Sequence, residues 1–324
     1  AALDLANAGH NISIIVPLMP YHYYYVALGN RRLAWIKSSV RHIQRRFHRK
    51  PFYSQGLLSD SEHQDKVSIN FVLRQASRSS LKQLDWLILH SIAGIAEYRG
   101  KYPQARQIYI CHHPEEWDHG HTESFRELRT SFEGKILAVS AKTALELANY
   151  MARPRLVPDC ISPIIWKQRE NALTKKNSRD VILVWKTNES GRVGAEIIRL
   201  LLTIRPDTKV TIWCRLGHGY ANIAKELLPM IPVVENISET ELSNLYLDHH
   251  MLLFPSTHEG FGMPPIEGLA CGCVPVLYRD VGAAEMYAGD GQNSIFIEGT
   301  LDSVAEKMSR VLDDEDKLQS MKSF

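Results

Sequence analysis

Two glutamates, Glu259 and Glu267, are separated by seven residues in a stretch rich in glycine and proline. Gly260 and Gly262 free the backbone of a loop after the first glutamate, and a pair of prolines suits the first turn of a helix. Such a loop turns its N–H groups and the positive end of the helix dipole toward one place. The segment therefore predicts a binding site for an anionic ligand.

The two carboxylates suit different parts of a sugar nucleotide. Glu259 is expected in the loop that faces the ligand. Glu267, near the end of the first helical turn, could accept hydrogen bonds from vicinal hydroxyls such as those of a ribose. An ordinary loop followed by a capped helix is the alternative interpretation of the same residues.

Apolar, β-branched runs of strand length alternate with helical patterns along the chain. Continuous apolar strands between amphipathic helices are what a parallel sheet covered on both faces requires. The sequence therefore predicts an α/β protein with doubly wound parallel sheets. The predicted strands are Ile12–Val16, Trp86–Leu89, Gln107–Cys111, Ile136–Val139, Val181–Trp185, Lys209–Trp213, Met251–Phe254 and Val274–Leu277.

The chain of 324 residues is long enough for two domains. Residues 167–179 are polar, highly charged and without periodicity, which is typical of an exposed connection. We expect a first domain over 1–166, a linker over 167–179 and a second domain over 180–324. Ligands of open parallel sheets bind at the carboxyl ends of the strands, so the functional residues are expected in the loops there.

The stretch from Glu259 to Val276 resembles the retaining glycosyltransferases of family four, the glycosyl transferases group 1, in the form EGFGxxxxEAxAxGxPVV. The first strand and the final crossing helix of that family are expected to lie outside the given sequence. The residues that match in register are Glu259, Gly260, Phe261, Gly262, Glu267, Ala270, Gly272, Pro275 and Val276, followed by Gly282, Glu285 and Gly291.

This resemblance implies a GT-B fold, in which two Rossmann-like domains face a central cleft. It implies metal-independent transfer of a sugar from a nucleotide-diphosphate sugar to a glycan or lipid-linked acceptor, with retention at the anomeric carbon. Glu267 would hold the ribose of the donor, and Glu259 the hydroxyls of the transferred sugar. The backbone groups that would contact the sugar and diphosphate belong to Gly260, Phe261, Gly262 and Met263.

Two cations upstream resemble the clamp that this family places on the donor diphosphate. Lys186 stands where the family usually has Arg, and Arg192 lies near its Lys. Either cation can neutralise the phosphates as the leaving group gains charge, although Lys lacks the planar fork of Arg. Trp185 replaces a usual Gly, and its bulk could crowd the approach. Two exposed surface cations are the alternative interpretation.

Histidines end two predicted strands of the first half, in DWLILH and QIYICHH. By resemblance, a histidine at the end of one of these strands reaches the donor sugar, with His112 as the first candidate and His113 as the second. A plain polar loop is one alternative, and a metal site with the acids and histidines that follow is another. The spacing matches no compact zinc pattern, so we expect no metal and no cofactor besides the donor substrate.

A basic segment over residues 31–50 carries eight Lys or Arg and no acid. Its apolar residues from Leu33 to Phe47 recur at helical spacing, which predicts a basic amphipathic helix. The helix could lie on an anionic membrane surface or pack on the first domain. Nucleic acid is not expected as a partner, because no recognised binding module is present.

Five thinly spread cysteines favour a reducing compartment, and no apolar run is long enough to span a bilayer. These features predict a cytoplasmic protein, with peripheral attachment to the inner face of the membrane as an option. A sugar-nucleotide epimerase on the same fold and a non-catalytic sugar-nucleotide-binding or assembly protein are the alternative functions. The motifs leave the base, the donor sugar, the acceptor and the oligomeric state open.

Overall fold

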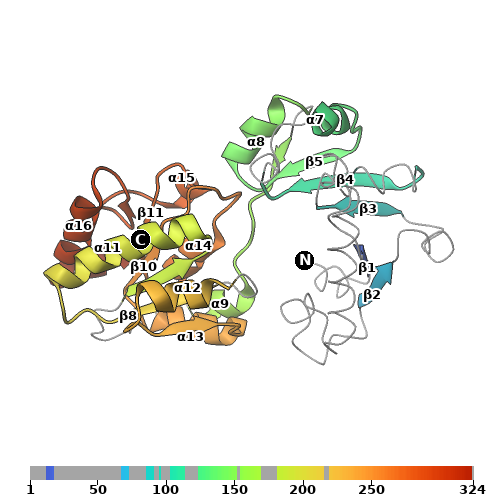
Figure 1. Ribbon diagram of the computed structural model, residues 1–324. Coiled ribbons are helices and arrows are strands. Elements are labelled where there is room, and N and C mark those ends of the chain that lie inside the picture. Colours follow the sequence, from blue (N-terminus) through green and yellow to red (C-terminus); the bar gives the residue numbers. More distant parts are fainter. Residues whose placement is uncertain are drawn as a thin grey trace. The chain divides into compact units, whose positions relative to one another are not determined.

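The computed structural model describes residues 12–17, 67–72, 85–90, 95, 103–113, 123–151, 154–168, 181–214 and 219–322. The chain divides into two compact units (Figure 1). The first comprises residues 1–137 and 146–155, and the second comprises residues 138–145 and 156–324. The basic segment 31–50 lies outside the described residues. Within the described ranges, every helix is too short or too polar to cross a lipid bilayer.

The first unit is built on two small sheets. One pairs β1 (Ile12–Pro17) in parallel with β2 (Val67–Val72). The other has the strand order β3-β4-β5-β6, and its first two strands are parallel. Its strands are β3 (Trp86–Leu89), β4 (Arg106–Cys111), β5 (Lys135–Ala138) and β6 (Arg155–Leu156). Helix α7 (Glu123–Thr130) belongs to the first unit, whereas α8 (Ala141–Ala148) is divided between the two units after Leu145.

The second unit contains a six-stranded parallel sheet with the order β12-β11-β10-β7-β8-β9. From β7 the chain adds β8 and β9 on one side, then returns to the other side of β7 as β10. The strand order therefore reverses between β7 and β10, which makes this the topological switch point. The strands are β7 (Val181–Trp185), β8 (Val210–Cys214), β9 (Val233–Glu235), β10 (Met251–Phe254), β11 (Val274–Leu277) and β12 (Ile295–Phe296).

Alternate side chains of the central strands enter two separate cores. On β7, Val181, Leu183 and Trp185 join one core, whereas Ile182 and Val184 join the other. Both faces of the sheet are thus buried, which explains why its strands are apolar without interruption. The first core includes α11 (Asn188–Ile204), α12 (Tyr220–Leu227), α16 (Leu301–Asp313) and α17 (Glu315–Lys322), and the second includes residues of α9 (Pro163–Lys167), α13 (Glu239–Leu247) and α15 (Ala284–Tyr287).

The predicted α/β architecture with doubly wound parallel strands is confirmed. Each predicted strand is present, with its ends within one residue of the expected position. The sequence did not indicate β2, β6 or β9. Two of these have only two or three residues, too few for a pattern of alternation.

Helix α9 belongs to the second unit. Ile165 is fully buried in the core that contains Ile182 and Leu252. The helix packs against α13 and against α14 (Met263–Ala270). Burial of one apolar side chain therefore ties this segment to the second sheet. Most of the predicted linker, residues 169–179, lies outside the described residues.

Trp185 does not crowd the carboxyl edge of the sheet, which corrects the expectation from its bulk. Its side chain is fully buried in the core under α11. The indole lies against Gly191 of that helix, so closely that a Cβ at this position would be 1.9 Å from the ring. The glycine in the helix therefore provides the room that the large side chain on the strand needs.

Gly191→Ala is expected to lower the free energy of unfolding by about 2 kcal/mol or more, because the added methyl group meets the Trp185 ring and overpacking is destabilising. At an uncrowded helix position the same exchange would stabilise the protein by roughly 1 kcal/mol. Urea unfolding measures the effect. The double variant Gly191→Ala with Trp185→Leu should lose less unfolding free energy than the two single variants lose in sum. Strictly additive losses would contradict the contact.

Candidate functional site

The carboxyl ends of β7 and β10 bring Lys186 and Glu259 together at the switch point. Lys186 directly follows β7, and Glu259 lies in the loop after β10. The Nζ atom of Lys186 donates a hydrogen bond to Oε2 of Glu259 within an ion pair. The lysine is 31% exposed and the glutamate 6% exposed. The cation is therefore accessible to a ligand, whereas the carboxylate lies beneath it.

Glu259 is also held by neighbours other than Lys186. Ser256 Oγ donates to its Oε1 atom at 2.8 Å, so both carboxylate oxygens are engaged. Tyr287 at the end of α15 lies near the same carboxylate. Burial, and secondly the charge of Glu259, raise the pKa of the Tyr287 phenol. Tyr287 therefore stays a neutral hydrogen-bond donor beside the loop.

Contacts from residues 282–287 fix the carbonyl groups of the glycine-containing loop. The N–H of Ala283 donates to the carbonyl of Phe261 at 2.8 Å, and Tyr287 Oη donates to the carbonyl of Gly262 at 3.3 Å. In a trans peptide the C=O and the following N–H point in opposite directions. The N–H groups of Gly262 and Met263 therefore point away from these contacts, as an anion-binding loop requires.

Two glycines allow this close packing. Gly262 precedes α14 with φ of 85°, a conformation that L side chains rarely adopt. Gly282 has φ of 57°, and a Cβ there would lie 2.4 Å from the Phe261 carbonyl oxygen. Gly260 and Phe261, which precede Gly262 in the loop, are buried. The loop is thus a fixed part of the edge, and Met263 begins the helix at its end.

Glu267 lies in the second turn of α14 and pairs with α13. Tyr246 Oη donates to its Oε2 atom at 3.0 Å. Burial raises the pKa of Glu267, the hydrogen bond from Tyr246 lowers it, and the charge of Glu239 raises it further. The net direction is upward. Glu267 is thus a half-buried carboxylate whose hydrogen-bond partner is a hydroxyl and not a cation.

Arg192 does not join the other predicted residues. It is exposed on α11 and makes no ion pair with any residue that the structure describes. Its side chain lies one turn beyond the capping box formed by Thr187 and Ser190 at the start of that helix. The structure thus joins Lys186 to Glu259 and leaves Arg192 on the surface.

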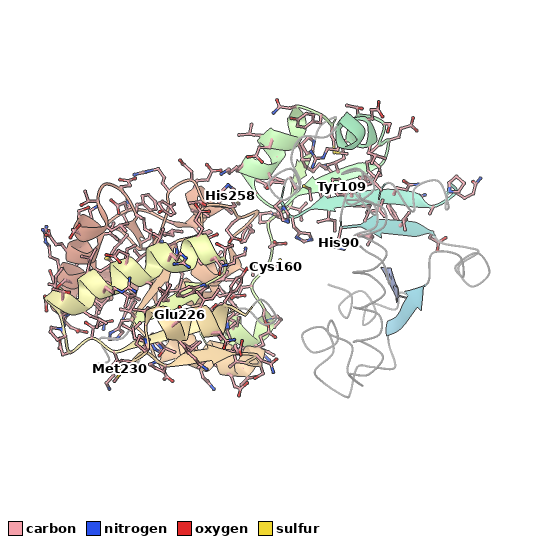
Figure 2. All side chains as sticks on the ribbon, viewed as in Figure 1. His90, Tyr109, Cys160, Glu226, Met230 and His258 are labelled. Atoms are coloured by element: carbon pink, nitrogen blue, oxygen red, sulfur yellow. The ribbon has the colours of Figure 1, made fainter. Side chains whose placement is uncertain are left out.

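In the first unit, His112 meets a second histidine that the sequence did not single out. His112 follows β4, and His90 follows the parallel neighbour β3 (Figure 2). Their rings stack with centroids 5.2 Å apart, and His90 Nδ1 lies 3.0 Å from His112 Nε2. The signal was present, because both predicted strands end in histidine. His113 is half-buried, and its carbonyl accepts from Cys111 Sγ at 3.2 Å.

Metal ligands are not clustered in the part of the chain that the structure describes. No group of three or more His, Cys, Asp or Glu side chains there is placed to hold a metal ion. The segment 114–122, which supplies the acids and histidines of the alternative metal site, lies outside the described residues.

Residues 221–324 match the model of the family described as Glycosyl transferases group 1. Among solved structures, Anabaena Alr3699/HepE in complex with UDP-glucose is similar with a TM-score of 0.64, at 14% identity over 80% of each chain. Sucrose-phosphate synthase from Thermosynechococcus elongatus is similar with a TM-score of 0.58, at 13% identity over 74% of this chain and 67% of the other.

TarM from S. aureus, solved with fondaparinux, alpha-GlcNAc-glycerol and UDP, has a TM-score of 0.57 at 13% identity. The match covers 74% of this chain but only 50% of the TarM chain. No curated protein matches the chain in sequence. The likeness to these structures shows that the fold is GT-B. The family match itself lies within the second unit.

Glu267→Gln is expected to raise the melting temperature near pH 8. The folded-state pKa of Glu267 lies above its unfolded value, so above that pKa the ionised carboxylate disfavours the folded state. A neutral amide removes this penalty. Below the ordinary glutamate pKa both states hold a protonated carboxyl group, and the gain should disappear.

Thermal unfolding over this pH range measures the difference between Glu267→Gln and the wild type. Glu226→Gln, an exposed glutamate on α12, serves as the matched control (Figure 2). A melting temperature that falls near pH 8 in the Glu267 variant, or a gain that persists unchanged in acid, would contradict the assigned environment.

Proposed function

We propose that the protein is a retaining glycosyltransferase that transfers a sugar from a nucleotide-diphosphate sugar to a glycan or lipid-linked acceptor. The observation that carries this proposal is the pair of Lys186 and Glu259 at the switch point, with Glu267 on the helix that follows. The family match over 221–324 supports it. So do the similar structures of HepE with UDP-glucose and TarM with UDP.

Each group has a distinct role in the proposed donor complex. Lys186 and the N–H groups of Gly262 and Met263 neutralise the diphosphate. Glu259 accepts hydrogen bonds from hydroxyls of the transferred sugar, and Glu267 accepts hydrogen bonds from the ribose diol. Charge builds on the diphosphate as it leaves, so fixed positive groups at this point favour the transition state over the bound donor.

The bond between the anomeric carbon and the phosphate oxygen breaks, and its electron pair stays on the nucleoside diphosphate. An acceptor hydroxyl attacks from the face that the phosphate leaves, and its proton passes to the departing phosphate oxygen. Glu259 is not the nucleophile in this scheme. Lys186 and Ser256 already engage its two carboxylate oxygens.

We also propose that transfer needs no metal and no cofactor besides the donor substrate, and that the protein acts in the cytoplasm. His112, with His113 as the second candidate, is proposed to contact the donor sugar, and His90 to orient the His112 ring. Peripheral attachment to the inner face of a membrane through residues 31–50 stays a prediction, because that segment lies outside the described residues.

Nucleotide binding is the first test. Thermal-shift measurements with UDP-, GDP- and ADP-sugars should identify a donor class that stabilises the wild-type chain. Glu267→Ala should weaken binding of that donor by roughly tenfold or more, because the ribose hydroxyls lose a charged acceptor. Glu226→Ala should leave binding as it is. Equal binding by the Glu267 variant and the wild type would contradict the site.

Transfer is the second test. Nucleoside diphosphate should be released from the donor only when an acceptor is supplied, which separates a transferase from an epimerase and from a non-catalytic binding protein. The anomeric configuration of the product, read by NMR, should equal that of the donor. An inverted product would contradict retention while leaving sugar transfer in place.

A further inference from the structure

We propose that Tyr246 is a positioning residue of the donor site, whose hydroxyl holds Glu267 in the orientation that receives the ribose diol of a nucleoside diphosphate. This inference rests on the proposed function. It assigns the choice between ribonucleotide and deoxyribonucleotide to a contact between α13 and α14 rather than to Glu267 alone.

The Tyr246 ring has little freedom to move. It is fully buried in the core on the α13 side of the sheet. Trp213 of β8 meets it edge to face, with ring centroids 6.3 Å apart and an interplanar angle of 87°. The Cys273 thiol donates to the Tyr246 carbonyl at 3.0 Å, which fixes the backbone as well. A hydroxyl on so constrained a ring defines the position of its partner.

The hydroxyl engages only one of the two carboxylate oxygens. Tyr246 Oη donates to Oε2 of Glu267 at 3.0 Å. No residue that the structure describes donates a hydrogen bond to Oε1 of Glu267. A carboxylate can accept several hydrogen bonds, so this arrangement leaves acceptor positions for two vicinal hydroxyls. The diol of a ribose has that geometry, whereas a deoxyribose lacks it.

The surroundings of Glu267 make Tyr246 important for its charge as well as its direction. Glu239 faces it from α13, and Cys271 and Cys273 lie near Tyr246 after α14. Among the described residues of α9, β10 and β11, no ionisable group shifts the pKa of Glu267. Of the influences on that pKa, only the hydrogen bond from Tyr246 lowers it. Removing the hydroxyl therefore favours the protonated carboxyl group, which is a poorer acceptor.

A purely structural role predicts a different result. If Tyr246 only tied α13 to α14, its loss would lower stability and weaken all nucleotides alike. A positioning role requires that only ligands with a ribose diol lose affinity when the Tyr246 hydroxyl is removed. It also requires that this loss of affinity disappear when Glu267 is replaced. The two roles are separated by comparing each nucleotide with its dideoxy analogue.

The experiment measures the affinity of the full chain by calorimetry for UDP, GDP and ADP, each against its 2′,3′-dideoxy analogue. The wild type should prefer the ribonucleotide of the base it binds. In Tyr246→Phe the ratio of ribonucleotide affinity to dideoxynucleotide affinity should fall roughly tenfold, because the ribonucleotide binds more weakly while the affinity for the dideoxy compound changes little. The acidic limb of ribonucleotide affinity should also move to higher pH, because the pKa of Glu267 rises.

Three further variants make the result specific. Glu267→Gln should abolish the preference, and adding Tyr246→Phe to it should cause no further loss, since the two residues act through one contact. Tyr150→Phe, a phenol of the first unit, should behave like the wild type. An unchanged preference in Tyr246→Phe, or equal weakening of both nucleotide forms, would overturn the inference while Glu267→Gln still supports the site. Failure of every nucleotide to bind the wild type would overturn both.

Discussion

A buried carboxylate beside a lysine is the interaction on which the functional edge of the second unit depends. Glu259 is almost fully removed from solvent, and an ionised group there is tolerated only with partners. Lys186 supplies the charge, and Ser256 supplies a hydroxyl. Because these groups follow different strands, the pair forms only when β7 and β10 lie side by side and in parallel. The chemistry of the edge is therefore a consequence of the strand order.

The same strand order explains why polar groups gather at this edge. The central strands are buried on both faces, so they admit only apolar side chains along their length. Polar residues are confined to the positions where strands end, and the reversal between β7 and β10 opens a place where two such ends diverge. The glycine-containing loop fills this place, and packing against Gly282 and Tyr287 keeps its amides directed away from the core.

Local pattern predicted much of this arrangement, whereas contacts between distant residues escaped it. The strands, the spacing of Glu259 and Glu267, and the cation at Lys186 were visible because each is a property of a short segment. The contact of Tyr246 with Glu267 and that of His90 with His112 were not visible, since each joins residues about twenty or more positions apart in the chain. The expectation that Trp185 crowds the site was wrong for a related reason. The ring packs against a glycine one turn into the next helix, which the local pattern did not indicate.

The two glutamates differ in what balances their charge, and this difference fits two different tasks. Glu259 is paired with a cation that a diphosphate would also attract, so ligand binding must redistribute a charge that the free protein has already neutralised. Glu267 has a neutral phenol beside it and a raised pKa. Its carboxylate is therefore stabilised by a hydroxyl donor and not by a cation. Neutral hydroxyl groups can still donate hydrogen bonds to the lone pairs of such a carboxylate. In the proposed donor complex, the neighbours of each carboxylate, rather than the carboxylates themselves, therefore decide which part of the donor it would meet.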